Sequence, residues 1–113
     1  MSFDVEILSV ATANPKFCIR QHEIDRNDMS LENIRGFLFH PGGAKVLVTI
    51  EQVLGIDQAM LVHSWEILRQ HGNMSSATAL FVLERALKAG ANGPHLLAAF
   101  GPGFSAYLMI ADL

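Results

Sequence analysis

Three glycine-containing turns, each at the end of a regular segment, limit how this chain can fold. They are residues 40–43 (His-Pro-Gly-Gly), 72–76 (Gly-Asn-Met-Ser-Ser) and 101–104 (Gly-Pro-Gly-Phe). Glycine and proline interrupt helices and strands, so we expect a regular element to end at each turn. Side chains at the ends of elements can converge on a pocket, which makes these turns the first candidates for a functional site.

Hydrophobic spacing predicts four strands. Apolar residues alternate with polar ones over residues 3–11, and a short apolar run at 36–40 leads into the first turn. The segments 95–100 and 104–111 flank the third turn and predict an antiparallel hairpin. Residues 16–29 are mixed and polar, so they are expected to be the least structured part of the chain.

Helical spacing appears between the first turn and the hairpin. It predicts helices over 46–54, 60–70 and 76–88, each followed within a few residues by a glycine. The third of these is almost wholly apolar, so we expect it to be buried on most sides. A short helical turn over 31–34 is expected to be capped by Ser30. The sequence therefore predicts an α/β layered domain, with three helices and a C-terminal antiparallel hairpin.

Length and composition limit the chain to one domain. Its 113 residues divide into an N-terminal strand and turn (1–15), a junction (16–29) and the main domain (30–113). Half of the residues are hydrophobic and 17% are charged. Because a small domain ordinarily carries more charge, some apolar faces are expected to need a partner, either a second copy or a longer related chain.

Charge and cysteine content argue against several classes of function. The net charge of −3 and the scattered basic residues offer no surface for nucleic acid or an anionic membrane. No apolar run is long enough to span a bilayer, and acidic residues interrupt the first apolar stretch, unlike in a signal peptide. A lone cysteine, Cys18, excludes an internal disulfide and argues against structural zinc. A reduced, cytoplasmic setting is expected.

Taken singly, the turn residues are weak signals. A histidine after a strand, such as His40, is more often a packed histidine than a functional one. Asn73 after a glycine is more often a turn or cap residue. His63 and His71 are eight residues apart, too far for a metal-binding pair on one helix, so no metal site is expected. The tryptophan and the methionines are interpreted as core.

Together, in this order, the motifs resemble one family. The residues concerned are Phe37-Leu38-Phe39-His40-Pro41-Gly42-Gly43, Gly72-Asn73-Met74-Ser75-Ser76 and Phe100-Gly101-Pro102-Gly103-Phe104. Residues 30–110 resemble the C-terminal end of the type III polyketide synthases, the chalcone and stilbene synthase-like acyltransferases of the thiolase fold. Residues 7–15 resemble the start of those enzymes.

The resemblance implies a partial thiolase-like fold with a mixed sheet, and a role for each motif. His40 and Asn73 would be the catalytic donors that stabilise the enolate left when malonyl-coenzyme A loses carbon dioxide. The substrates would be acyl- and malonyl-coenzyme A thioesters, with no further cofactor. The positions that would contact the coenzyme A arm or border the substrate cavity are Gly42, Gly43, Ala44, Ser75, Gly101, Pro102 and Gly103.

The sequence departs from the family pattern in two ways. The segment that carries the nucleophilic cysteine of the family is missing between the first strand and His40, so the chain is interpreted as truncated and as inactive in condensation by itself. Cys18, flanked by Lys16 and Arg20, is better interpreted as an incidental thiol than as a substitute. Tyr107 stands where the family usually has an acidic residue.

Three hypotheses remain open on the sequence alone. The chain is an acyltransferase-like protein that retains part of the chemistry once a partner completes the coenzyme A tunnel. Alternatively it is a non-catalytic remnant that associates with itself or with a full-length synthase to cover apolar surface. The third hypothesis, a small α/β domain with an accidental match, requires three ordered motifs to coincide by chance.

Overall fold

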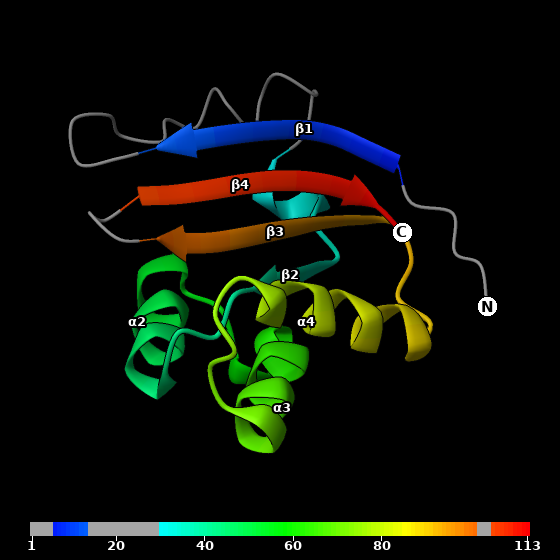
Figure 1. Ribbon diagram of the computed structural model, residues 1–113. Helices are drawn as coiled ribbons and strands as arrows, with labels where there is room; N and C mark the ends of the chain where they lie inside the picture. Colours follow the sequence, from blue (N-terminus) through cyan, green and yellow to red (C-terminus); the bar gives the residue numbers. More distant parts are fainter. Residues whose placement is uncertain (1–5, 14–29, 102–104) are drawn as a thin grey trace.

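The structure, a computed structural model, describes residues 6–13, 30–101 and 105–113 (Figure 1). In chain order its elements are β1 (Glu6–Ala13), η1 (Leu31–Asn33), β2 (Gly36–Phe39), α2 (Ala44–Leu54), η2 (Gln58–Leu61), α3 (Val62–His71), α4 (Ala77–Lys88), β3 (Pro94–Gly101) and β4 (Ser105–Asp112). The predictions for the Asn14-Pro15 turn, the junction at 16–29, Cys18, Pro102 and Gly103 lie outside the described residues.

The strands form one mixed sheet in the order β1-β4-β3-β2. β4 pairs antiparallel with both β1 and β3, whereas β2 runs parallel to β3. The first and last strands of the chain therefore lie side by side, and the helices gather beyond β2 (Figure 1). The predicted α/β class, the three helices and the C-terminal hairpin are confirmed.

Two hydrophobic clusters cover opposite faces of this sheet, because side chains alternate along each strand. One cluster contains Ile34, Phe37, Phe39, Leu47, Leu61, Leu96, Ala98 and Ile110. The other contains Leu38, Ile67, Val82, Ala86, Leu97 and Ala111. Helix α2 and η2 contribute to the first cluster and α4 to the second, so the helices enclose the β2–β3 side of the sheet from both faces.

Helix α3 covers the free edge of β2. His40 donates its backbone N–H to Ala98 O at 2.7 Å, on the β3 side. In a parallel ladder, neighbouring residues point their backbone groups in opposite directions, so those of Phe39 point away from β3. The fully buried Ser64 Oγ donates to Phe39 O at 2.7 Å and accepts from Phe39 N at 3.2 Å. This single hydroxyl thus satisfies two backbone groups at an edge that water cannot reach.

Most predicted element boundaries agree with the structure. Gly55 ends α2 with φ 63°, a left-handed conformation that glycine adopts without strain, and Gly72 ends α3. The helix predicted over 60–70 begins instead with the short η2, capped by the Asp57 carboxylate, which accepts from Ala59 N at 2.8 Å. The predicted turn after Ser30 is η1.

The prediction that the third helix is buried on most sides is wrong. In α4 only Thr78, Val82 and Ala86 are buried, at a spacing of four residues that makes one narrow stripe. Leu80 is 67% and Phe81 40% exposed. Alanine and leucine are favoured in helices for their backbone preference as well as for burial, so an apolar helical sequence does not by itself specify how many sides are covered.

Candidate functional site

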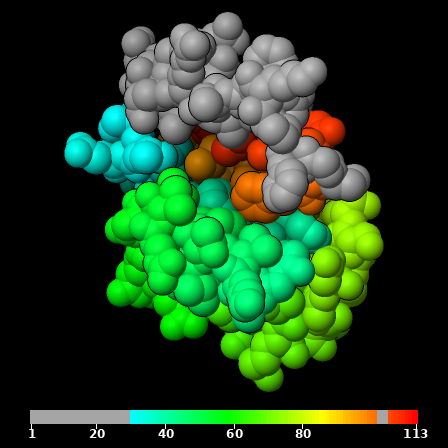
Figure 2. All heavy atoms as spheres, turned by 90° about the vertical axis from the view of Figure 1, so that its left-hand side faces the viewer, coloured from blue at the N-terminus to red at the C-terminus, as the bar shows by residue number. Residues whose placement is uncertain are grey.

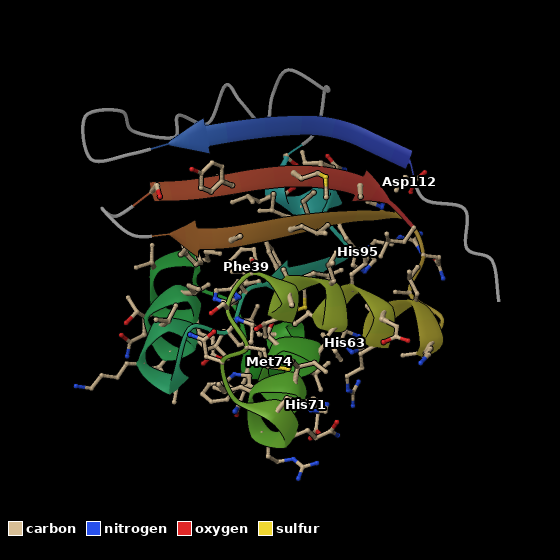
Figure 3. The ribbon with its side chains drawn as sticks, in the orientation of Figure 1. Phe39, His63, His71, Met74, His95 and Asp112 are labelled. Carbon is tan, nitrogen blue, oxygen red and sulfur yellow. The ribbon has the colours of Figure 1, made fainter. Side chains whose placement is uncertain are left out.

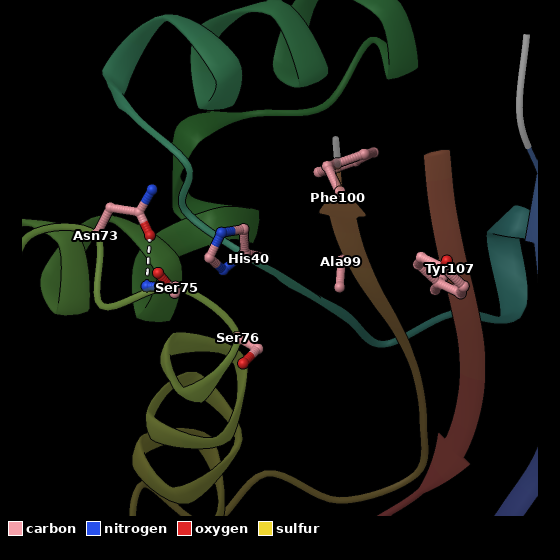
Figure 4. Close-up of a pocket in the computed structure, with 8 residues that line it drawn as sticks. His40, Asn73, Ser75, Ser76, Ala99, Phe100 and Tyr107 are labelled. Atoms are coloured by element: carbon pink, nitrogen blue, oxygen red, sulfur yellow. Dashed lines mark hydrogen bonds between the residues drawn. The ribbon is translucent and has the colours of Figure 1, made fainter. Parts of the chain in front are cut away.

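One cavity of about 450 Å³ lies where the ends of several elements meet. It is lined by His40, Asn73, Ser75, Ser76, Ala99, Phe100, Gly101 and Tyr107. Figure 2 shows the loop before α2, the start of α4 and the end of β3 next to one another on one face, and Figure 4 shows the lining residues. The two polar residues singled out from the sequence, His40 and Asn73, therefore share a cavity although they lie 33 positions apart in the sequence.

His40 enters the cavity from the end of β2. Its backbone hydrogen bond to Ala98 holds the residue beside β3, and His40 is only 7% exposed. Within the described residues, the buried ring nitrogen Nδ1 has no hydrogen-bond partner. Burial lowers the pKa of His40, because desolvation penalises the imidazolium form. The ring is therefore neutral at pH 7, with one nitrogen as donor and the other as acceptor.

Asn73 is held by its own loop. Its Oδ1 accepts from Ser75 N at 2.8 Å, the dashed bond in Figure 4, and its Nδ2 donates to Gly42 O at 3.4 Å. The short bond assigns the oxygen to the Ser75 side, so the amide NH2 lies on the other side. One of its two N–H groups makes only a long contact and the other is unused among the described residues, which leaves a donor for a ligand.

The loop that carries Asn73 contains a strained backbone position that its neighbours hold in place. Ser75 has φ 62°, and it is the one non-glycine residue with positive φ in the described part of the chain. Such a conformation costs on the order of 1–3 kcal/mol and persists only where neighbours impose it. Here Asn73 bonds the Ser75 N–H, and Met74 N donates to the buried Thr78 Oγ1 at 2.8 Å. The loop leads into α4, whose N-terminal end carries a partial positive charge beside the cavity.

Only some of the residues predicted to contact the substrate line the cavity. Ser75 and Gly101 line the cavity, whereas Gly42, Gly43 and Ala44 do not. These three residues form the loop and first residue of α2, next to the site, because Gly42 O is the acceptor for Asn73. A Cβ added to Gly43 would meet no atom within 4 Å, so the backbone there is open to approach.

The sequence missed Ser76, Ala99, Phe100 and Tyr107 in this lining. Tyr107 comes from β4 and pairs directly with Ala99 of β3. The predicted hairpin, taken with its correct register, is the signal that would have placed Tyr107 beside the end of β3.

Other histidines lie elsewhere. His95 is at the start of β3, the far end of that strand from the cavity, and His63 lies on α3 (Figure 3). His63 Nδ1 accepts from Arg85 Nη1 at 2.8 Å, and His95 Nδ1 is 2.8 Å from Gly93 O. Over the described ranges, no three His, Cys, Asp or Glu side chains gather in a way that would hold a metal ion.

Comparisons with known proteins agree with the fold and with the family that the sequence resembles. The family "Chalcone and stilbene synthases, C-terminal domain" matches residues 17–111, which includes most of the predicted junction. A putative chalcone synthase of Bacillus subtilis strain 168 is 40% identical over 90 residues, covering 77% of this chain and 25% of that protein. The chain thus spans about a quarter of that relative's length.

Solved structures show the same relationship. The C-terminal type III polyketide synthase domain of Steely1, from Dictyostelium, has a TM-score of 0.73 and 30% identity over 81% of this chain and 26% of that one. CsyB, solved in complex with CoA-SH, has a TM-score of 0.80 over 96% of this chain and 40% of that one, at 22% identity, and so shows the fold alone. The mixed sheet and its helices are those of a type III polyketide synthase.

The chain belongs to the chalcone and stilbene synthase family, of which it matches the C-terminal domain. None of the helices in the part of the chain that the structure describes has the length and hydrophobicity needed to cross a membrane.

Proposed function

We propose that His40 and Asn73 act as paired hydrogen-bond donors to the carbonyl oxygen of a coenzyme A thioester. With malonyl-coenzyme A, the loss of carbon dioxide leaves an enolate, and two donors aimed at its oxygen stabilise the developing charge. The single observation that carries this proposal is that both side chains line one cavity, and that within the described residues the Asn73 amide N–H groups make only one long contact, to Gly42 O at 3.4 Å.

The state of His40 suits a donor rather than a charged acid. Burial keeps the ring neutral, so one nitrogen carries the proton. Nδ1 is enclosed, whereas Nε2 lies on the ring edge that faces Gly42, the acceptor for Asn73. An Nε2–H on that edge would point towards the same region as the amide of Asn73. Both donors would then act at one oxygen.

The loop before α2 is the proposed contact for the coenzyme A arm. Gly42, Gly43 and Ala44 adjoin the cavity without lining it, and the space around Gly43 is open. Backbone N–H groups at the start of α2 are available to a phosphate or amide of the arm. CsyB, which has the same fold, was solved in complex with CoA-SH, the free thiol of coenzyme A, and this supports coenzyme A derivatives as the ligand class.

We also propose that this chain by itself does not complete a condensation. Acyl loading in this kind of chemistry needs an activated nucleophile. The one cysteine of the sequence, Cys18, lies outside the described residues, and no other thiol is present. The chain would therefore be a truncated, acyltransferase-related piece that requires a second polypeptide, in a cytoplasmic setting, for the complete reaction.

The test is release of carbon dioxide from malonyl-coenzyme A labelled at its free carboxylate. Asn73→Asp keeps the oxygen that holds Ser75 but removes the N–H donors, and His40→Ala removes the imidazole together with its N–H donor. Each is expected to reduce release by about a hundredfold, as for other oxyanion donors. Asn92→Asp, a matched change at a residue bonded to Arg35 outside the cavity, should leave the rate unchanged. Equal rates in all variants, or no release by the unaltered chain, contradict the proposal.

A second candidate function is self-association or association with a full-length synthase. The exposed Leu80 and Phe81 on α4, with the exposed Val62 on α3, favour it. Sedimentation should then show dimers that Leu80→Asp dissociates. A monomer at all concentrations would contradict this candidate without bearing on the chemistry of the cavity.

A further inference from the structure

Tyr107 has a place in the cavity that the chemistry of His40 and Asn73 does not explain. Its side chain lines the cavity from β4, and the residue is 52% exposed. Among the described residues, none hydrogen-bonds its hydroxyl. A half-exposed aromatic ring is ordinary on a protein surface. A half-exposed ring inside the cavity of a candidate active site offers apolar surface to whatever the cavity binds.

The strand register places this ring across the cavity from His40. Tyr107 pairs directly with Ala99, so both side chains project from the same face of the sheet. His40 follows β2, and its backbone is bonded to Ala98 of β3. From the line of β2 to β4 there are two strand spacings, or about 10 Å. The small methyl group of Ala99 lies between them and leaves this distance open.

Phe100 does not provide an equivalent wall. Its ring packs edge-on against Phe39 with centroids 6.3 Å apart. It is thus directed towards the hydrophobic cluster that contains Phe39. Figure 4 shows the Phe100 ring turned away from His40, while Tyr107 stands on the neighbouring strand. Tyr107 is thus the aromatic ring that remains for a ligand among the described lining residues.

Gly101 allows the ring to lie where it does. A Cβ at this position would be 2.8 Å from Ser105 Oγ and 3.8 Å from Tyr107 Cε2. Glycine therefore lets the end of β3 and the start of β4 approach closely. The Tyr107 ring thus lies beside Gly101, and half of the residue stays exposed towards the cavity.

We propose that Tyr107 selects the acyl group of the thioester: its ring is the apolar wall against which a medium-length acyl chain packs when His40 and Asn73 hold the carbonyl. This inference rests on the proposed function and adds the substrate class. An acetyl group is too short to cross from His40 to the ring, whereas an octanoyl chain reaches it. The cavity is polar at one end and apolar at the other, which matches such a thioester.

The test compares the affinity of the chain for octanoyl-coenzyme A and acetyl-coenzyme A by calorimetry. Tyr107→Ala should weaken octanoyl-coenzyme A about fivefold to tenfold, the scale of one lost aromatic contact, and leave acetyl-coenzyme A within about twofold. Tyr107→Phe keeps the ring and should keep the preference. Phe81→Ala is the matched control, because Phe81 is a 40% exposed aromatic residue on α4 that does not line the cavity.

A measurement on the unaltered chain keeps the test independent of folding of the variants. Tyr107 is the one tyrosine in the sequence, so its ring protons are identifiable by NMR. Nuclear Overhauser effects from the octanoyl methylenes to this ring are expected, and their absence in the bound complex overturns the inference. Binding of both thioesters with equal affinity overturns it while leaving the proposed function intact. Failure to bind either thioester overturns both.

Discussion

Ser64 gives the most quantitative prediction, because one hydroxyl satisfies two backbone groups at the covered edge of the sheet. Its Oγ is bonded to both Phe39 O and Phe39 N, and the residue is fully buried. Ser64→Ala leaves this carbonyl and this N–H without partners. An unsatisfied buried group costs about 1–3 kcal/mol, so losing the partner of two groups should lower the free energy of unfolding by about 2–6 kcal/mol.

The assay is urea denaturation followed by fluorescence of Trp65, the one tryptophan and the next residue in α3. Its Nε1 donates to Glu51 Oε1 at 2.6 Å, so unfolding changes the surroundings of the indole. With a denaturant slope of about 1.5 kcal/mol/M, the expected loss lowers the urea midpoint by about 1.3–4 M. That is a large part of the stability of a domain this size.

Ser30→Ala provides the comparison. Ser30 also hydrogen-bonds through its hydroxyl, to Asn33 Oδ1 at 3.1 Å, but at an exposed position. Its removal should cost about 1 kcal/mol or less, since water replaces the lost partner. If Ser64→Ala shifts the midpoint no more than Ser30→Ala does, the account of the β2 edge is wrong.

Two further predictions concern protonation and close packing. Burial, then the nearby charges of Arg85 and His95, lower the pKa of His63, so the unfolded chain takes up a proton at a pH where the folded chain does not. Stability should therefore fall as the pH drops below the ordinary histidine pKa of about 6.5. His63→Gln should flatten this pH dependence in urea denaturation. An equally steep dependence in the variant would contradict the assignment of the effect to His63. Gly101→Ala places a methyl group 2.8 Å from Ser105 Oγ and should lower thermal stability and thioester affinity together. Unchanged melting and affinity would show that the strands can separate there at no cost.

Local patterns in the sequence were enough to predict most elements. The apolar run before His40 is a strand, the helical spacing after it gives α2, and Gly55 ends that helix with φ 63°. These features depend on residues close together in the chain, where backbone preference and side-chain period act directly. The C-terminal hairpin was predictable for the same reason.

Features that depend on distant residues were not predictable in this way. The pairing of β1 with β4 joins the two ends of the chain, and nothing near either strand specifies it. Ser64 looks like an ordinary helical serine until the edge of β2 is placed beside it. The exposure of Leu80 and Phe81 depends on which neighbours cover α4, and the composition of the helix does not encode this.

The candidate site was predictable only in part, and through motifs rather than geometry. The turns at 40–43 and 72–76 identified His40 and Asn73, which the fold brings to one cavity. Their roles stay a prediction. Tyr107 was noted as a departure from the family, but its place in the lining required the register of β3 and β4.

The central claim, that an imidazole and a carboxamide meet the same thioester, is tested most directly by NMR titration with acetyl-coenzyme A. The account predicts that the ring signals of His40 and the side-chain amide signals of Asn73 shift together with one dissociation constant, while the amide of Asn92 stays unchanged. Shifts of Asn73 and His40 with different dissociation constants, or shifts of neither, would contradict it.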